Sequence, residues 1–116
     1  MIQTTTLDRA VRLHTLVMPV SGHGATVVAG DLLEVQLREL GGSGAQWQVA
    51  EQPPELRHDR EDVVGPGPGA VGEFSSRLFR FRAIREGTGV LRLVIGRPGA
   101  LQPAGTIELH VTVTEE

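Results

Sequence analysis

Apolar and polar residues alternate along several stretches of this chain. The stretches 33–37, 79–83 and 106–113 each place an apolar residue at every second position, with polar or charged residues between. Successive side chains of a β-strand point to opposite faces of the sheet, so a period of two predicts half-buried strands. No stretch repeats its apolar residues with a convincing helical period.

Clusters of glycine and proline separate these stretches, notably at 41–44, 65–69 and 96–105, and predict turns or loops there. The run 90–95 is apolar apart from one arginine, which favours a central strand. The charged run 57–64 fits either an edge strand or a loop. We therefore expect strands at 13–20, 26–29, 32–38, 45–50, 57–64, 76–84, 88–96 and 104–114.

This pattern predicts an all-β fold, an immunoglobulin-like β-sandwich of seven to eight antiparallel strands. Trp47 falls in one of these strands and is expected in the core. A length of 116 residues fits one domain. We expect a flexible leader over 1–12 and a single sandwich domain over 13–116, with Leu13–Val20 as a candidate edge strand for pairing two copies.

Composition limits the kind of partner. The formal net charge is −3 and no basic block occurs, so a nucleic acid is not expected. No apolar run reaches membrane-spanning length and no export signal is apparent, so we expect no membrane partner and a cytoplasmic location. All eleven basic residues are arginine, and lysine, asparagine and tyrosine are absent, which predicts a GC-rich and therefore bacterial genome.

Candidate catalytic and metal-binding groups are sparse. The chain has no cysteine, and no serine lies in a nucleophile elbow. The four histidines do not share the spacing of metal ligands. His58 lies beside acidic residues, but a solvated turn explains it better than a weak cation site, and His110 is expected on the surface. We expect no enzymatic activity, no cofactor and no metal.

Three loops carry a resemblance to a known family. The strand at 32–37 leads into Gly41-Gly42-Ser43-Gly44, followed by Trp47. This order resembles chagasin-type cysteine protease inhibitors, in which the loop is Asn-Pro-Thr-Thr-Gly and a tryptophan follows. The last glycine and the tryptophan match, and Ser43 stands at the second threonine, whereas the first three loop residues differ.

The other two family loops are also present in altered form. The family's Gly-x-Gly-Gly loop corresponds to Gly69-Ala70-Val71-Gly72, with valine for one glycine. Its Arg-Pro-aromatic loop corresponds to Arg97-Pro98, followed by Gly99 instead of an aromatic residue. The resemblance covers roughly residues 21–113.

The resemblance implies an inhibitor that wedges three loops into the active-site cleft of papain-like cysteine proteases. Arg97 would contact an acidic or carbonyl group of the protease. The loss of the aromatic residue predicts weak inhibition unless Leu101 compensates. The residues implied to bind the protease are Gly41, Gly42, Ser43, Gly44, Gly69, Val71, Gly72, Arg97, Pro98 and Gly99.

Three other functions remain open at the level of sequence. The same fold could serve as a non-inhibitory intracellular module that binds another protein or a peptide, because every loop has lost part of the family motif. A second alternative, less favoured because no convergent acid/base pair can be named, is an enzyme that uses arginine and histidine around a small ligand. A homo-oligomer that pairs through an edge strand is the third.

Overall fold

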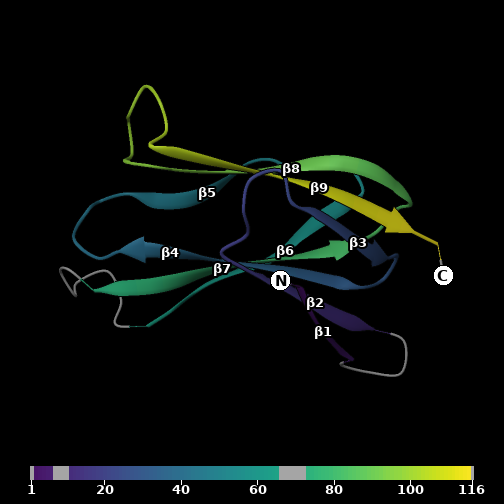
Figure 1. Ribbon diagram of the computed structural model, residues 1–116. Helices are drawn as coiled ribbons and strands as arrows, with labels where there is room; N and C mark the ends of the chain where they lie inside the picture. Colours follow the sequence, from purple (N-terminus) through teal and green to yellow (C-terminus); the bar gives the residue numbers. More distant parts are fainter. Residues whose placement is uncertain (1, 7–10, 66–72, 116) are drawn as a thin grey trace.

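The computed structural model describes residues 2–6, 11–65 and 73–115. Nine strands follow one another in this part of the chain (Figure 1). They are β1 (Ile2–Thr6), β2 (Arg12–Val17), β3 (Gly24–Val28), β4 (Leu32–Leu40), β5 (Gln46–Glu51), β6 (Leu56–Val64), β7 (Phe74–Ala83), β8 (Gly87–Gly96) and β9 (Gly105–Thr114). The described residues contain no helix long and apolar enough to cross a membrane.

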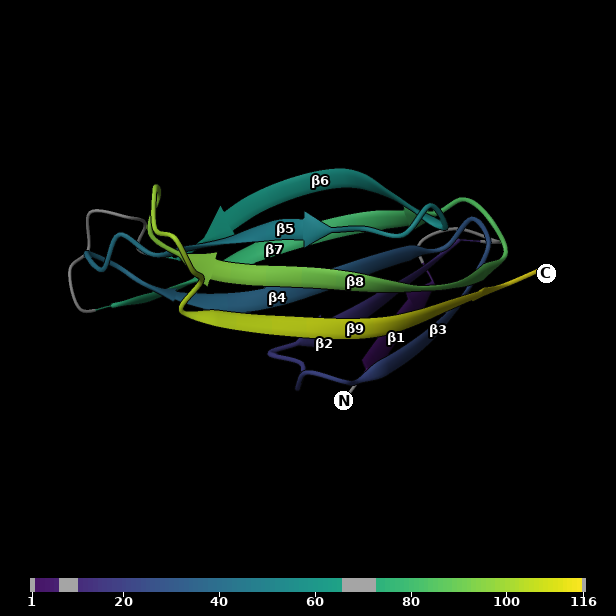
Figure 2. The same ribbon diagram turned by 90° about the horizontal axis from the view of Figure 1, so that it is seen from above.

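The strands form two sheets stacked in layers. The five-stranded sheet has the order β1-β2-β4-β7-β6, and the four-stranded sheet has the order β3-β9-β8-β5. From above, the long strands of both layers follow the long axis of the molecule (Figure 2). The predicted β-sandwich is therefore confirmed. The inner position of β8 confirms the central strand predicted from the apolar run 90–95.

The core lies between the two sheets and is filled by the inward-facing residues of the alternating stretches. Trp47 is only 7% exposed, and its indole Nε1 donates a hydrogen bond to the Arg38 carbonyl oxygen at 2.8 Å. His110 lies exposed on β9, so both expectations are confirmed. The buried apolar cluster comprises Leu16, Ala25, Val27, Leu33, Val35, Leu37, Trp47, Leu56, Phe79, Phe81, Ala83, Leu91, Leu93, Leu109, Val111 and Val113.

The strand count and the pairing direction differ from the prediction of seven to eight antiparallel strands. All eight expected strands are present, and β1 is a ninth. Two pairings are parallel, β2 with β4 and β3 with β9. Between β2 and β4 the chain crosses to β3 in the other sheet and returns, so β4 runs in the same direction as β2.

The N-terminal segment also differs from the prediction. Where we expected a flexible leader over 1–12, Ile2–Thr6 pairs antiparallel with β2. Its threonines are β-branched and favour a strand. The segment Leu13–Val20 is not an edge, because β2 lies between β1 and β4. The charged run 57–64 does form an edge strand, β6, one of the two structures expected for it.

Candidate functional site

Three connections between strands begin at one end of the sandwich, on the left of Figure 1. They are the β4–β5 loop (41–45), the β6–β7 loop (65–73) and the β8–β9 loop (97–104). The structure thus brings the first and third predicted loops together. The predicted site residues of the second loop, Gly69, Val71 and Gly72, lie outside the described residues.

The β4–β5 loop is a tight turn held by its own serine. Ser43 Oγ donates to the Leu40 carbonyl oxygen at 2.7 Å and accepts from the Ala45 amide at 3.2 Å. Gly42 and Gly44 have φ angles of 83° and 79°, in the left-handed region that favours glycine. The Gly-Ser-Gly sequence therefore shapes the turn through its backbone geometry and its hydrogen bonds.

Hydrogen bonds join the β4–β5 loop to both neighbouring loops. The Gly41 amide donates to the carbonyl oxygen of Glu73, the last residue of the β6–β7 loop, at 2.8 Å. On the other side, Arg97 Nε donates to the Ser43 carbonyl oxygen at 3.0 Å. Arg97 was expected to contact a partner, but its Nε links two loops of this protein. The loop end therefore forms one connected surface.

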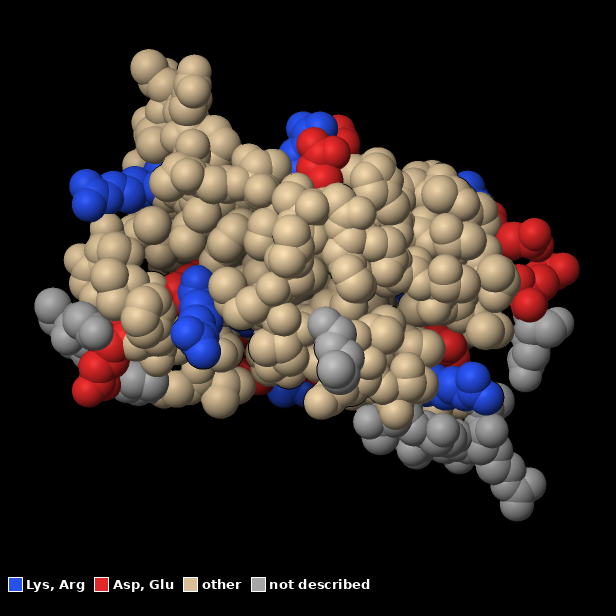
Figure 3. All heavy atoms as spheres, in the orientation of Figure 1, with Lys and Arg blue, Asp and Glu red and all other residues tan. Residues whose placement is uncertain are grey.

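The β8–β9 loop projects from the sandwich and is almost wholly uncharged. Arg97, Pro98 and Gly99 are all exposed, and the Ala100 amide closes a turn by donating to the Arg97 carbonyl oxygen at 3.1 Å. Figure 3 shows uncharged atoms over the projection. Leu101 is fully exposed, at 102%, so an apolar side chain stands free on this loop.

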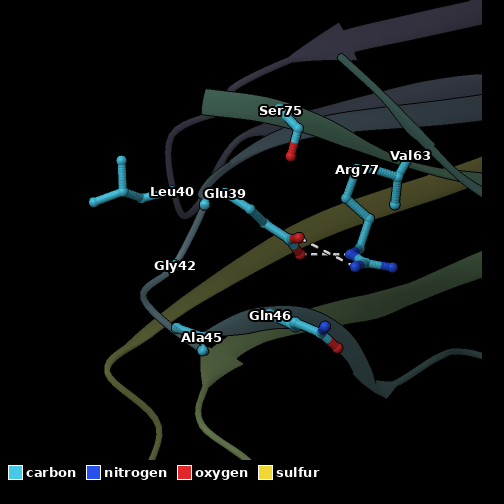
Figure 4. A pocket seen from close by; sticks show the side chains of 10 residues that line it. Glu39, Leu40, Gly42, Ala45, Gln46, Val63, Ser75 and Arg77 are labelled. Carbon is cyan, nitrogen blue, oxygen red and sulfur yellow. Dashed lines mark hydrogen bonds and ion pairs between the residues drawn. The ribbon is translucent and has the colours of Figure 1, made fainter. Parts of the chain in front are cut away.

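A cavity of about 340 Å³ lies between the β4–β5 loop and strands β6 and β7 (Figure 4). Glu39 and Arg77 point toward each other inside it. Arg77 Nη2 donates to Glu39 Oε1 at 3.1 Å, and Arg77 Nε donates to Glu39 Oε2. Arg77 Nη1 also donates to Glu61 Oε2 at 2.6 Å. The cavity is thus lined by the Glu39–Arg77 pair from β4 and β7, and Arg77 also connects this pair to Glu61 on β6.

The sequence contained a signal for Glu39 and Arg77 that the search for family motifs missed. Glu39 continues the inward-facing series of β4 after Leu37, and Arg77 continues that of β7 before Phe79. Each therefore places a charge where the alternation predicts an apolar residue. The hydrogen bond from Arg77 to Glu39 raises the pKa of Arg77 and outweighs burial, so the guanidinium stays charged.

A second polar cluster lies near the start of β4, at the end of the sandwich away from the three loops. Thr4 Oγ1 is 3.0 Å from His14 Nδ1, and His14 Nε2 is 2.8 Å from Asp31 Oδ2. This order of groups is that of a nucleophilic triad. However, Asp31 also accepts the backbone amides of Val28 at 3.1 Å and Arg12 at 3.3 Å. The cluster therefore joins β1, β2 and the β3–β4 turn, which is a structural role.

His58, considered from the sequence for a weak cation site, faces an aromatic side chain. Its ring stacks on Phe81 with a centroid distance of 5.1 Å, and its Nε2 lies 3.2 Å from the Arg60 carbonyl oxygen. Within residues 2–6, 11–65 and 73–115, no group of three or more histidine, aspartate or glutamate side chains is arranged to hold a metal ion.

A β-sandwich that carries a connected set of loops at one end defines a class of binding domain, in which a rigid scaffold presents loops to a partner. The sequence model of the chagasin family of peptidase inhibitors, I42, matches residues 26–113. The protein belongs to this family, and the resemblance found in its loops is confirmed. A comparison with curated proteins gives no match.

Several solved structures share the fold of this chain. The inhibitor EhICP2 from Entamoeba histolytica is 22% identical, with a TM-score of 0.74 over 87% of this chain and 95% of that one. Amebosin is 23% identical, with a TM-score of 0.72, and the match covers 86% of this chain and 96% of amebosin. PbICP-C, in its complex with falcipain-2, is 14% identical, with a TM-score of 0.56, and the match covers 88% of this chain and 98% of PbICP-C. At these identities, the similarity establishes the fold.

Proposed function

We propose that the protein inhibits papain-like cysteine proteases and is not itself an enzyme. The β4–β5 loop enters the active-site cleft, and the other two loops contact the cleft walls. The observation that carries this proposal is the hydrogen-bonded loop end of a chain that belongs to the chagasin family. The names of two similar structures support it, since EhICP2 is a cysteine protease inhibitor and PbICP-C is bound to falcipain-2.

The loop geometry supports binding with little rearrangement. An inhibitor interface buries about 1,600 Å² in total, and the ordering of flexible loops reduces its affinity. The bonds of Ser43 within its turn, and the bond of Arg97 to that turn, hold two loops in place before a partner arrives. The glycines therefore allow close backbone approach without leaving the β4–β5 loop unconstrained.

The apolar anchor of the third loop differs from that of the family. Gly99 stands where the family has an aromatic residue, and its φ of 81° disfavours a side chain there. Leu101, two residues further on, is fully exposed and offers an apolar contact. We propose that Leu101 makes this contact instead. Its side chain is smaller than an aromatic one, so it contributes less to the affinity for the protease.

Titration of papain with the purified protein, followed by hydrolysis of a fluorogenic peptide, tests the proposal. We expect competitive inhibition with an inhibition constant of about 1 μM or lower. Ser43→Trp removes the hydroxyl that holds the turn and adds bulk at its tip, so this variant should lose inhibition. His110→Trp adds the same side chain on the exposed face of β9 and should inhibit like the parent protein.

A folded protein that leaves papain and a cathepsin-type protease fully active at high micromolar concentration would contradict the proposal. That result would favour the non-inhibitory binding module. Equal inhibition by Ser43→Trp and the parent protein would contradict the role of the β4–β5 loop, even if the protein inhibits.

A further inference from the structure

The β4–β5 loop lacks the support that holds an ordinary hairpin. β4 belongs to the five-stranded sheet and β5 is the edge of the other sheet, so no ladder of backbone hydrogen bonds joins the two ends of the loop. Two other bonds close its base. The Trp47 amide donates to Glu39 Oε2 at 2.7 Å, and Trp47 Nε1 donates to the Arg38 carbonyl oxygen at 2.8 Å.

Glu39 can close the loop because Arg77 fixes its carboxylate. Both carboxylate oxygens accept from the Arg77 guanidinium, and Glu39 is only 7% exposed. Arg77 is in turn bonded to Glu61 on the edge strand β6. Such two-point, charge-assisted bonds define the position of a side chain more strictly than a single neutral bond.

Global stability alone does not explain these charges. Burial of an ion pair removes both groups from water, and apolar residues of similar size often stabilise a fold equally well. Glu39 follows three buried apolar positions on β4, namely Leu33, Val35 and Leu37, which an apolar residue would simply extend. A carboxylate at this position can accept the Trp47 amide across the gap between the sheets, whereas an apolar side chain cannot.

We propose that Glu39 and Arg77 are positioning residues of the inhibitor. They fix the base of the β4–β5 loop and so hold the loop in the geometry that binds the protease. This inference rests on the proposed function. Without the network, the loop ends separate more freely, and binding has to order a more mobile loop.

The test compares Glu39→Gln with the matched control Glu34→Gln. Glu34 lies on the same strand, is 6% exposed and pairs with Arg80 at 3.3 Å, but it is directed to the outer face of the sheet. We expect the inhibition constant for papain to rise about tenfold or more in Glu39→Gln and to change less than about twofold in Glu34→Gln. Urea unfolding of both variants separates this effect from stability.

A second measurement needs no protease. Amide hydrogen exchange in the free protein should become faster at the amides of 42–45 in Glu39→Gln and stay unchanged there in Glu34→Gln. Arg77→Lys keeps the positive charge but loses the two-point bond, so it should show a smaller change of the same kind. This variant also serves if Glu39→Gln does not fold.

The outcomes separate this inference from the proposed function. Suppose that the parent protein inhibits papain. The positioning role is then wrong if Glu39→Gln inhibits as well as the parent protein, or if Glu34→Gln weakens inhibition as much as Glu39→Gln does. If the parent protein does not inhibit papain, the proposed function fails. Amide hydrogen exchange in the free protein then tests whether Glu39 and Arg77 hold the β4–β5 loop in place. Faster exchange at 42–45 in Glu39→Gln alone then supports this role, and equal exchange in both variants overturns it.

Discussion

Trp47 serves the core and the loop base with different atoms. Its ring packs among the buried residues between the sheets, its Nε1 bonds to the Arg38 carbonyl oxygen, and its amide bonds to Glu39. The side chain that fills the core at this end therefore also ties β5 to β4. Substitutions at this position can separate the contribution of packing from that of the indole hydrogen bond.

Trp47→Ala should lower the free energy of unfolding by about 3–5 kcal/mol, because it leaves a large cavity in the core. Trp47→Phe keeps most of the packing and loses the bond to Arg38, so part of this loss should be recovered. Urea unfolding measures both. A change of less than about 1 kcal/mol in Trp47→Ala would contradict the core position of the ring.

Leu101→Ser should weaken the inhibition of papain about tenfold or more without changing the urea midpoint, because an exposed apolar anchor contributes to binding but not to folding. Ile84→Ser is the matched control, since Ile84 is 48% exposed and lies in the β7–β8 connection, at the far end of the sandwich. An unchanged inhibition constant in Leu101→Ser would show that the β8–β9 loop does not contact the protease through this residue.

At the scale of elements, Asp31 joins the N-terminal strands to the β3–β4 turn. Burial alone would raise the pKa of Asp31, but the hydrogen bonds from His14 and from the Val28 and Arg12 amides outweigh it. The pKa of Asp31 in the folded protein is therefore lowered below its ordinary value of 3.8. A carboxyl group with a lowered pKa in the folded state stabilises the protein above its unfolded pKa, and this contribution is lost as the pH falls through the folded value.

Asp31→Asn should therefore be less stable than the parent protein at pH 7, and the difference should shrink as the pH falls below about 4. Urea unfolding across this pH range measures the difference. Asp59→Asn, on the exposed strand β6, should follow the pH dependence of the parent protein. A difference between Asp31→Asn and the parent protein that stays constant down to pH 2 would contradict the role of the charge.

Strands were predictable from the sequence because alternation is a local signal. The period of two located β4, β7 and β9, and glycine or proline marked the turns between strands. The parallel pairings of β2 with β4 and of β3 with β9 depend on which sheet each strand joins, which alternation does not encode. Ile2–Thr6 was missed because its residues do not alternate in polarity, so only its pairing with β2 identifies it as a strand.

At the scale of the whole molecule, chain direction explains why the three connections begin at the same end of the sandwich. β4, β6 and β8 each end where a candidate loop begins, and the chain returns through β5, β7 and β9. The pairings of β6 with β7 and of β8 with β9 are antiparallel. The connections that follow β4, β6 and β8 therefore begin at the same end of the sandwich. Family motifs in the sequence identified these loops, although they had lost several signature residues.

The contacts that hold the loops in place were not predictable in the same way. Arg97 and Ser43 are far apart in the sequence, as are Glu39 and Arg77, and each pair meets only after the sheets have stacked. From the sequence we expected Arg97 to contact a protease, because the residues next to it in the sequence offer no carboxylate or other obvious hydrogen-bond acceptor within the turn. Folded geometry was needed to show that its Nε binds the neighbouring loop.

The most direct test of the account is amide hydrogen exchange of the protein with and without papain. The account predicts slower exchange in the complex at 41–45 and 97–104, and unchanged exchange at the opposite end, around the β3–β4 and β7–β8 turns. Protection confined to the opposite end or to an edge strand such as β6, or no protection under conditions in which papain is inhibited, would contradict it.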